Sequence, residues 1–220
     1  MVEFVATLIF VFLGAGSVVV SGGLPNGELD PARLVLIALA HGLTITFLAY
    51  ATANISGGHL NPVVTFAAVI TKKMRTARGL MFVAAQLVGG IAGAALLLAT
   101  IPDAADTNFG AHALGPDVSI GMGLGMEIVV TFVLVFVVFA TAVDPRGIGN
   151  LATLAIGLVV AVDHLVAVPI TGASMNPARS LGPAVLAGAW ADHWIYWAGP
   201  LLGASGAAIM YQLAFINRPR

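Results

Sequence analysis

Apolar residues recur along this chain in runs of about 20, separated by short polar or glycine-rich segments. A helical run of that length can span the roughly 30 Å hydrocarbon core of a bilayer. The pattern predicts an all-α membrane protein with six transmembrane helices: Val2–Val20, Leu34–Asn54, Ala77–Thr100, Ile120–Val143, Leu151–Val168 and Trp194–Ile216.

Two further apolar segments, Asn61–Ile70 and Asn176–Leu186, are too short to cross. Ten helical residues rise about 15 Å, which is half of the hydrocarbon core. Each segment starts with Asn-Pro, and Asn is a favoured N-cap while Pro suits the first helical turn. Because backbone at membrane depth must be satisfied inside the protein or line a cavity, we predict two half-spanning re-entrant helices.

Composition supports this interpretation. The chain is 59% hydrophobic and only 9% charged, whereas soluble domains carry about 25% charged residues. A net charge of −1 gives no reason to expect nucleic acid as a partner. The absence of cysteine excludes a thiolate metal site, and no pattern indicates a metal or cofactor. The start of the chain lacks the basic residues of a signal peptide.

Basic residues predict the orientation of the spans. With six spans, seven of the nine Lys and Arg residues fall on one side, and only Arg33 and Arg179 fall on the other. Since cytoplasmic loops carry the excess of positive charge, both termini are predicted to be cytoplasmic.

The chain also repeats itself. The segment EFVATLIFVF from Glu3 aligns with EIVVTFVLVF from Glu127, and SGGHLNP aligns with TGASMNP. We expect one channel domain, residues 1–220, built from repeats at about 1–110 and 120–220. Three spans per repeat invert the second copy, so the half-helices enter from opposite faces and meet near the midplane.

The meeting point has a specific electrostatic character. Each helix N-terminus carries roughly +0.5 of an elementary charge, so two opposed termini repel cations. Asn61 and Asn176 can each direct a side-chain NH2 towards the lumen and donate to a passing oxygen. This arrangement favours the passage of water.

These features resemble the major intrinsic protein family, the aquaporins, along essentially the whole chain. The paired boxes of that family read here Asn61-Pro62-Val63 and Asn176-Pro177-Ala178, with Val63 in place of the usual Ala. The stretches ANISGGHLNP, ATAVDPRG and SMNPARSLGPAV resemble plant tonoplast members in particular. The resemblance implies a passive water channel that is not an enzyme and that forms homotetramers in the membrane.

The resemblance also implies a selectivity filter on the extracellular side. Matched by spacing to the boxes, its residues are His41, His164, Ala173 and Arg179. An arginine at membrane depth is by default functional, although it could also be a snorkelling residue at a span end. Glycerol-conducting relatives usually carry Gly at the position of His164 and Asp after the Arg, so Ser180 disfavours glycerol.

His41 departs from the Phe usual in water channels, and together with His164 it makes a more polar filter. His112, fifteen residues before Glu127, matches a loop histidine of ammonia-permeable tonoplast members. We hypothesise that His112 approaches Arg179 and extends the filter, so that ammonia also passes. The alternative is a solvated loop histidine.

Further polar residues lie beside the boxes. Glu3 and Glu127 occupy matching repeat positions, and a carboxylate in an apolar span is rarely without a partner. They are expected to accept hydrogen bonds from the backbone ahead of each half-helix, although a proton relay is an alternative. By resemblance, His59 lines the cytoplasmic half of the pore.

Other classes of protein remain as alternatives. Inverted repeats with broken helices also suit a secondary transporter, and a channel for glycerol, urea or hydrogen peroxide is a further possibility. The GASG at Gly203–Gly206 matches the serine motif of intramembrane proteases, but no later histidine supplies a base. Small residues there favour close helix packing. The short start and short loops favour a plasma membrane, and the tonoplast-like motifs a vacuolar one.

Overall fold

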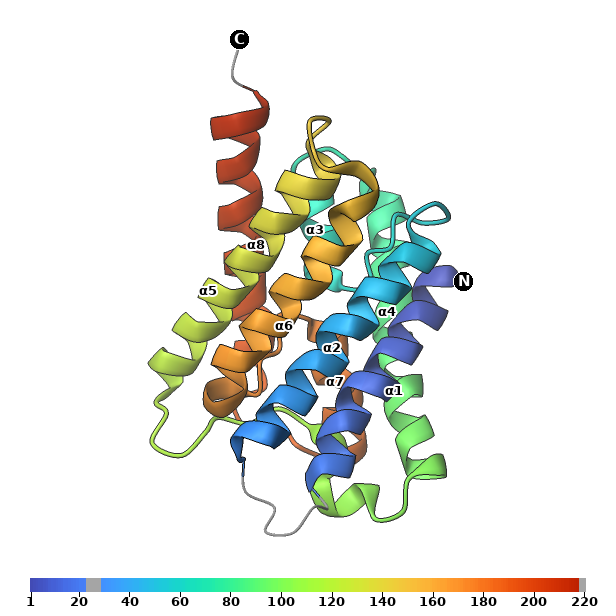
Figure 1. Ribbon diagram of the computed structural model, residues 1–220, viewed down its shortest axis with the longest axis vertical. Coiled ribbons are helices and arrows are strands. Elements are labelled where there is room, and N and C mark those ends of the chain that lie inside the picture. The colour runs from blue at the N-terminus through green and yellow to red at the C-terminus, as the bar shows by residue number, and fades with distance from the viewer. Residues whose placement is uncertain (23–28, 218–220) are drawn as a thin grey trace.

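The computed structural model describes residues 1–22 and 29–217 of the chain. Six helices in these ranges are long and apolar enough to cross a membrane (Figure 1). They are α1 (Val2–Gly22), α2 (Pro31–Thr52), α4 (Thr76–Thr100), α5 (Ile120–Val138), α6 (Ala152–Thr171) and α8 (Ile195–Tyr211). The short helices α3 (Pro62–Ile70) and α7 (Pro177–Ala187) lie among them. The predicted all-helical fold with two half-length helices is confirmed.

Most predicted boundaries lie within a few residues of the observed ones, and two differ for local reasons. Helix α2 starts earlier, at Pro31, because Asp30 caps it by accepting a hydrogen bond from the backbone N–H of Arg33 at 2.8 Å. Helix α6 continues past Val168 through Pro169 to Thr171, and Gly172 then stops it with a φ of 83°, the left-handed conformation that glycine allows.

Short irregular helices complete the chain. Helices α5 and α8 each continue into a π turn, η2 (Phe139–Val143) and η4 (Gln212–Ile216). The segment after α4 contains the 3-10 helix η1 (Ala104–Gly110), and another, η3 (Gly149–Leu151), precedes α6. The carboxylate of Asp144, just after η2, accepts hydrogen bonds from Arg146 and from the Tyr211 hydroxyl at the end of α8. These contacts connect the two π turns.

The long helices pack in close pairs, α1 with α4, α2 with α6 and α5 with α8. Glycine permits the closest approach: a Cβ added to Gly42 on α2 would lie 2.6 Å from the carbonyl oxygen of Gly157 on α6. A Cβ added to Gly203 would lie 2.3 Å from the carbonyl oxygen of Ile128 on α5. The GASG segment is therefore a helix-packing surface.

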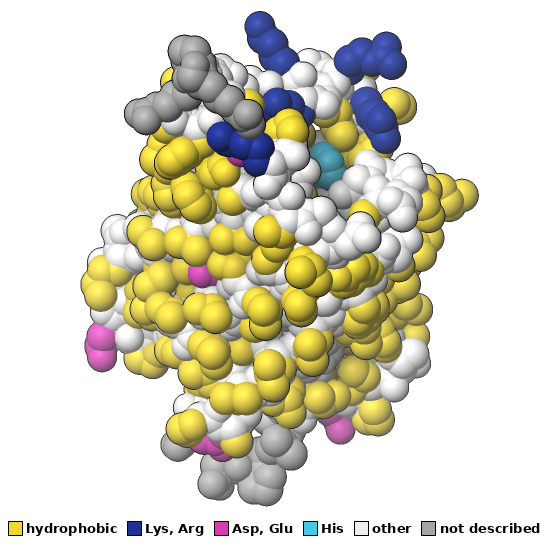
Figure 2. Space-filling view, turned by 45° about the horizontal axis from the view of Figure 1, so that its top comes forward, with side chains coloured by type: hydrophobic (Ala, Val, Ile, Leu, Met, Phe, Trp, Pro, Cys, Tyr) yellow, Lys and Arg dark blue, Asp and Glu magenta, His cyan; other side chains and the backbone are white. Residues whose placement is uncertain are grey.

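The outer surface matches a protein embedded in lipid. Hydrophobic side chains cover the molecule in a broad band, and Lys and Arg side chains gather at one end (Figure 2). Exposed leucines such as Leu43 and Leu158, both on long helices, belong to this apolar surface. Lys72, Lys73 and Arg75, in the loop after α3, are exposed. The chain is an integral multi-pass membrane protein, and this basic end is the one predicted to face the cytoplasm.

Candidate pore and selectivity filter

Each half-helix begins at its Asn-Pro pair. The Asn61 side-chain oxygen accepts a hydrogen bond from the N–H of Val63 at 2.9 Å, and Pro62 occupies the first turn. In α7 the oxygen of Asn176 accepts from Ala178 at 3.0 Å and from Arg179 at 3.3 Å. These N-caps satisfy N–H groups that a helix start otherwise leaves without partners.

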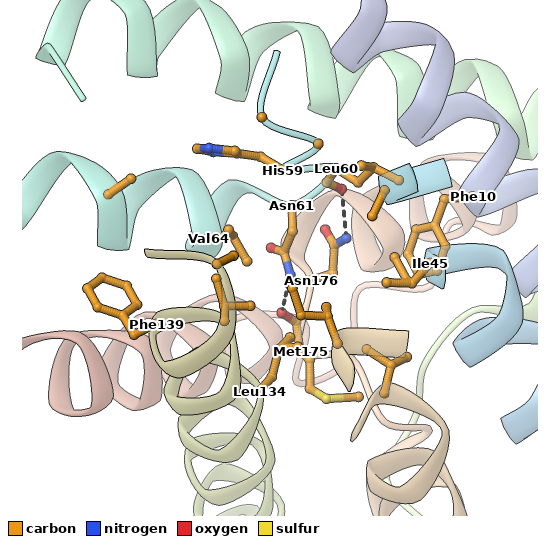
Figure 3. Close-up of a pocket in the computed structure, with 18 of the residues that line it drawn as sticks. Phe10, Ile45, His59, Leu60, Asn61, Val64, Leu134, Phe139, Met175 and Asn176 are labelled. Atoms are coloured by element: carbon orange, nitrogen blue, oxygen red, sulfur yellow. Dashed lines mark hydrogen bonds between the residues drawn. The ribbon is translucent and has the colours of Figure 1, made fainter. Parts of the chain in front are cut away.

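The two asparagines also hold the half-helices together. Asn61 donates from Nδ2 to the carbonyl oxygen of Met175 at 2.8 Å, and Asn176 donates to the carbonyl oxygen of Leu60 at 3.0 Å. Figure 3 shows these crossed bonds where α3 and α7 meet end to end. Because an amide NH2 carries two hydrogens, each asparagine keeps one donor for a molecule in the lumen.

Leu60 and Met175, the residues before the two asparagines, have an unusual backbone. Their φ angles are 53° and 49°, in the left-handed region that non-glycine residues rarely adopt. Each is bonded on both sides, since its carbonyl accepts from the opposite asparagine and its N–H donates to a buried carboxylate. Such strain, of order 1–3 kcal/mol per residue, persists only where neighbours enforce it. Here it orients the carbonyls that bridge the boxes.

Glu3 and Glu127 are those carboxylates. Glu3 accepts from the N–H groups of His59 and Leu60 at 3.1 and 2.8 Å and from Gln86 Nε2 at 2.8 Å. Glu127 accepts from Ser174 N and Met175 N, both at 2.9 Å, and from the Thr171 hydroxyl at 2.7 Å. Every partner named here donates a hydrogen bond to a carboxylate oxygen, and an ionised carboxylate can only accept.

A cavity of about 240 Å³ opens on the basic side of the boxes. His59, Asn61, Asn176 and His164 contribute polar groups to its wall. The Nδ1 of His59 lies 3.0 Å from the Thr65 hydroxyl. The rest of the wall is mostly apolar and comes from residues including Phe10, Ile45, Val64, Leu134, Val138, Phe139 and Val160. A pathway with apolar walls and a few polar groups allows small neutral molecules to pass without tight binding.

A second cavity of about 220 Å³ lies beyond the half-helices. Arg33, Gly110, His112 and Arg179 are among its lining residues. His164 lines the first cavity and Arg179 the second, so these two residues bracket the boundary between the cavities.

Three residues of the predicted filter, His41, His164 and Arg179, come together at this boundary. The imidazoles of His41 and His164 stack with ring centroids 4.1 Å apart. Arg179 donates from Nε to Nε2 of His41 at 3.3 Å and from Nη1 to the carbonyl of Gly110 at 2.7 Å. Ala173 is fully buried with φ 62°, in the loop just before the second box.

The backbone fixes the tautomers of both histidines. His41 Nδ1 lies 2.9 Å from the carbonyl of Ile37, and His164 Nδ1 lies 2.8 Å from that of Val160. A nitrogen facing a carbonyl carries the proton, so each neutral ring keeps Nε2 as an acceptor. Arg179 already donates to Nε2 of His41, so the boundary offers Nε2 of His164 as an acceptor and the remaining guanidinium N–H groups as donors.

The structure places His112 beside the filter, within the outer cavity wall. Its Nδ1 lies 2.9 Å from the hydroxyl of Ser180, the residue after Arg179, and its ring packs against Tyr196 at 5.1 Å. His112 is 8% exposed, so the alternative of a solvated loop histidine is wrong. Burial and the nearby Arg179 charge hold the pKa of the His112 imidazole well below its usual value, so the ring is neutral at neutral pH.

Several contributors to this site were not expected from the sequence. Leu60 and Met175 act through their backbone, and Gln86 and Thr171 reach the carboxylates from other helices. The signal for Leu60 and Met175 is their shared position before the asparagines. Gln86 is a polar residue within an apolar span, which also indicates a buried partner. Among the described residues, no group of three His, Cys, Asp or Glu side chains is arranged to hold a metal.

Half-helices that meet end to end, with a cavity on either side and a cationic constriction, define a membrane channel. Comparison with known proteins identifies the kind. The family model for the major intrinsic proteins matches residues 1–211. The chain belongs to the major intrinsic protein family, whose members are aquaporin channels and not enzymes. The alternatives of an intramembrane protease and a secondary transporter are thereby excluded.

Similar individual proteins support this family membership. A probable TIP-type aquaporin from Medicago truncatula is 44% identical over 218 residues, covering 98% of this chain and 86% of the relative. Aquaporin-4 from Mus musculus is 46% identical over 215 residues, covering 97% of this chain and 66% of the relative. The X-ray structure of the aquaglyceroporin from Plasmodium falciparum has a TM-score of 0.83 at 22% identity, covering 96% and 93% of the two chains. This last likeness shows the fold alone.

Proposed function

We propose that this aquaporin conducts water in single file down an osmotic gradient while excluding protons and ions. The observation that carries the proposal is the pair of crossed asparagine bonds between the two cavities. Each asparagine keeps one N–H for a lumen water, and the filter offers further donors and acceptors. The apolar remainder of the wall lets each water move on.

Cations meet two barriers on this route. The N-termini of α3 and α7 face each other, and their partial positive charges add. Arg179 places a full positive charge beside the outer cavity, and its hydrogen bonds go to a carbonyl and an imidazole rather than to a carboxylate. Within the described residues no carboxylate pairs with Arg179, so a cation beside it meets an uncompensated positive charge.

Stopped-flow light scattering of proteoliposomes tests this function. Vesicles with protein should shrink in an impermeant osmolyte at least about tenfold faster than protein-free vesicles, which equals a barrier lowered by about 1.4 kcal/mol. Glycerol should enter both kinds of vesicle at the same slow rate, because polar rings narrow the filter. Fast entry of glycerol, urea or hydrogen peroxide without fast water flux would instead favour a small-solute channel.

We propose ammonia as an additional permeant. The supporting observations are the imidazoles of His41 and His164 at the boundary and the neutral, buried His112 beside Arg179. A neutral imidazole nitrogen can replace the hydrogen bonds that ammonia loses on leaving water. Alkalinisation inside vesicles loaded with a pH dye measures the flux.

The His41→Phe substitution provides the test of that filter assignment. Phenylalanine removes the polar ring that accepts the hydrogen bond from Arg179, so ammonia flux should fall by at least about threefold, which corresponds to a barrier raised by at least about 0.65 kcal/mol. If ammonia flux of the unaltered protein equals that of protein-free vesicles, ammonia is not a permeant. If neither ammonia nor water flux changes in His41→Phe, the filter assignment is wrong.

We further propose that the chain forms homotetramers with one pore per subunit, which family membership supports. The relatives divide between TIP-type aquaporins and Aquaporin-4, so they do not single out one membrane. We propose the plasma membrane because the loops are short, and cytoplasmic termini because Lys and Arg gather at one end of the molecule. Native mass spectrometry and protease access to terminal tags in intact cells test the two statements separately.

A further inference from the structure

Gly14 on α1 lies directly against the imidazole ring of His41. A Cβ added to Gly14 would lie 2.8 Å from both Cδ2 and Nε2 of that ring. Atoms in ordinary contact stay roughly 3.5–4.0 Å apart, so any side chain at this position would have to move the ring. Gly14 is itself buried in the helix bundle.

The ring is held on its other sides. Its Nδ1 is bonded to the carbonyl of Ile37 at 2.9 Å, and its plane stacks on His164 at 4.1 Å with 28° between the rings. His164 is itself bonded to Val160 at 2.8 Å. The rings of Phe10 and His41 are nearly perpendicular, at 83°, with their centroids 5.9 Å apart. A displaced imidazole therefore cannot turn freely to another position.

The helices that carry the two histidines, α2 and α6, cannot move closer together to make room either. A Cβ on Gly42 of α2 would lie 2.6 Å from the Cβ of Ala161 on α6, so the two backbones are already in close contact. Pressure from α1 on His41 is therefore directed into the filter. The atom that would be pushed, Nε2, is also the atom that accepts the hydrogen bond from Arg179.

We propose that Gly14 is a specificity-determining position of the pore, because its missing side chain sets where the His41 ring, and through it Arg179, can sit. This inference rests on the proposed function of the filter, and it adds Gly14, which is not itself a filter residue. A methyl group at position 14 would narrow the constriction and weaken the contact between His41 and Arg179.

The Gly14→Ala variant is compared with Gly125→Ala on α5, where an added Cβ meets nothing within 4 Å. Both changes improve helix propensity alike. Water permeability per channel should fall at least about threefold in Gly14→Ala, because the displaced ring would move into the boundary between the two cavities, and should be unchanged in Gly125→Ala. Equal permeability of Gly14→Ala and the unaltered protein would overturn the proposal.

A double variant separates an effect through the ring from general damage to the bundle. In a His41→Ala background the added methyl group has no ring to displace, so Gly14→Ala should cause no further loss of water flux. An equal loss with and without His41 would contradict the proposal. Thermal unfolding of all variants in detergent checks that the fold is retained.

The ring can also be observed directly, whatever the flux. Histidine labelled with ¹⁵N gives ring signals for the five histidines, and those of His41 are the ones lost in His41→Ala. In Gly14→Ala the Nε2 signal should shift because its Arg179 donor is displaced. An unshifted Nε2 signal in Gly14→Ala would refute the inference about Gly14, whatever the water flux. Absence of water flux through the unaltered protein would refute only the proposed function.

Discussion

Arg179 is the residue on which ion exclusion depends in this account. It is 1% exposed, and it donates to an imidazole and to a backbone carbonyl. Neither partner is negatively charged, so the full charge of the guanidinium acts on anything in the adjoining outer cavity. A charge held this way at membrane depth is costly and is typical of a functional residue.

Replacing this charge should therefore admit cations. The Arg179→Ala variant should raise proton or sodium leak at least about tenfold, the effect of a barrier lowered by 1.4 kcal/mol, while water flux persists. Dye-loaded vesicles under a potassium diffusion potential measure the leak. Lys73→Gln, on the exposed loop after α3, is the matched control for loss of a positive charge. An unchanged leak in Arg179→Ala would assign exclusion to the half-helix termini alone.

The buried neutral state of His112 has a consequence for acid stability. The unfolded chain binds a proton at this residue below pH about 6.5, whereas the folded protein resists protonation because its pKa is lowered. Unfolding therefore takes up a proton, and acidification from pH 7.5 to 5 should destabilise the fold. The His112→Asn variant should lose less thermal stability over this range than the unaltered protein. Equal losses would show that His112 titrates normally.

At this scale the sequence predicted residues that are chemically unusual for a membrane span. The Asn-Pro pairs, Arg179 and the histidines stand out against apolar neighbours. Gly14 and Leu60 do not, because glycine and leucine are common in membrane spans. Gly14 acts by leaving room for a neighbouring ring, and Leu60 acts through its backbone N–H and carbonyl groups. The role of His41 as acceptor for Arg179 also needed coordinates, since it joins residues 138 positions apart.

The half-helices are the elements that organise the channel. Each has the same construction: an asparagine cap, a left-handed residue before it, and a buried carboxylate from α1 or α5 behind that residue. The periodic repeat predicted the paired caps and carboxylates. It could not predict the hydrogen bonds between the two Asn-Pro segments, because those depend on how closely α3 and α7 approach each other.

The Glu127→Gln variant distinguishes a supporting carboxylate from a proton relay. A Gln side chain puts an NH2 where one acceptor oxygen faced a backbone N–H, which leaves at least one buried donor without a partner. The expected loss of stability is about 1–3 kcal/mol, seen as a lower unfolding temperature in detergent. Glu3→Gln should behave alike. Altered proton flux with unchanged stability would favour the relay instead.

For the molecule as a whole, composition and periodicity were sufficient to predict an all-helical membrane protein with six spans and two half-length helices. The apolar surface and the internal polar line both follow from the same rule, that backbone and polar groups in lipid must be satisfied inside the protein. Exact helix ends, such as the extension of α6 through Pro169, depended on local capping that hydropathy does not detect.

The most direct test of the central claim is the osmotic water permeability of reconstituted vesicles as a function of temperature. A continuous file of hydrogen-bonded water predicts fast shrinkage with a weak temperature dependence, while protein-free vesicles shrink slowly with a steep one. Shrinkage as slow and as temperature-dependent as in protein-free vesicles, from correctly folded and inserted protein, would contradict the account.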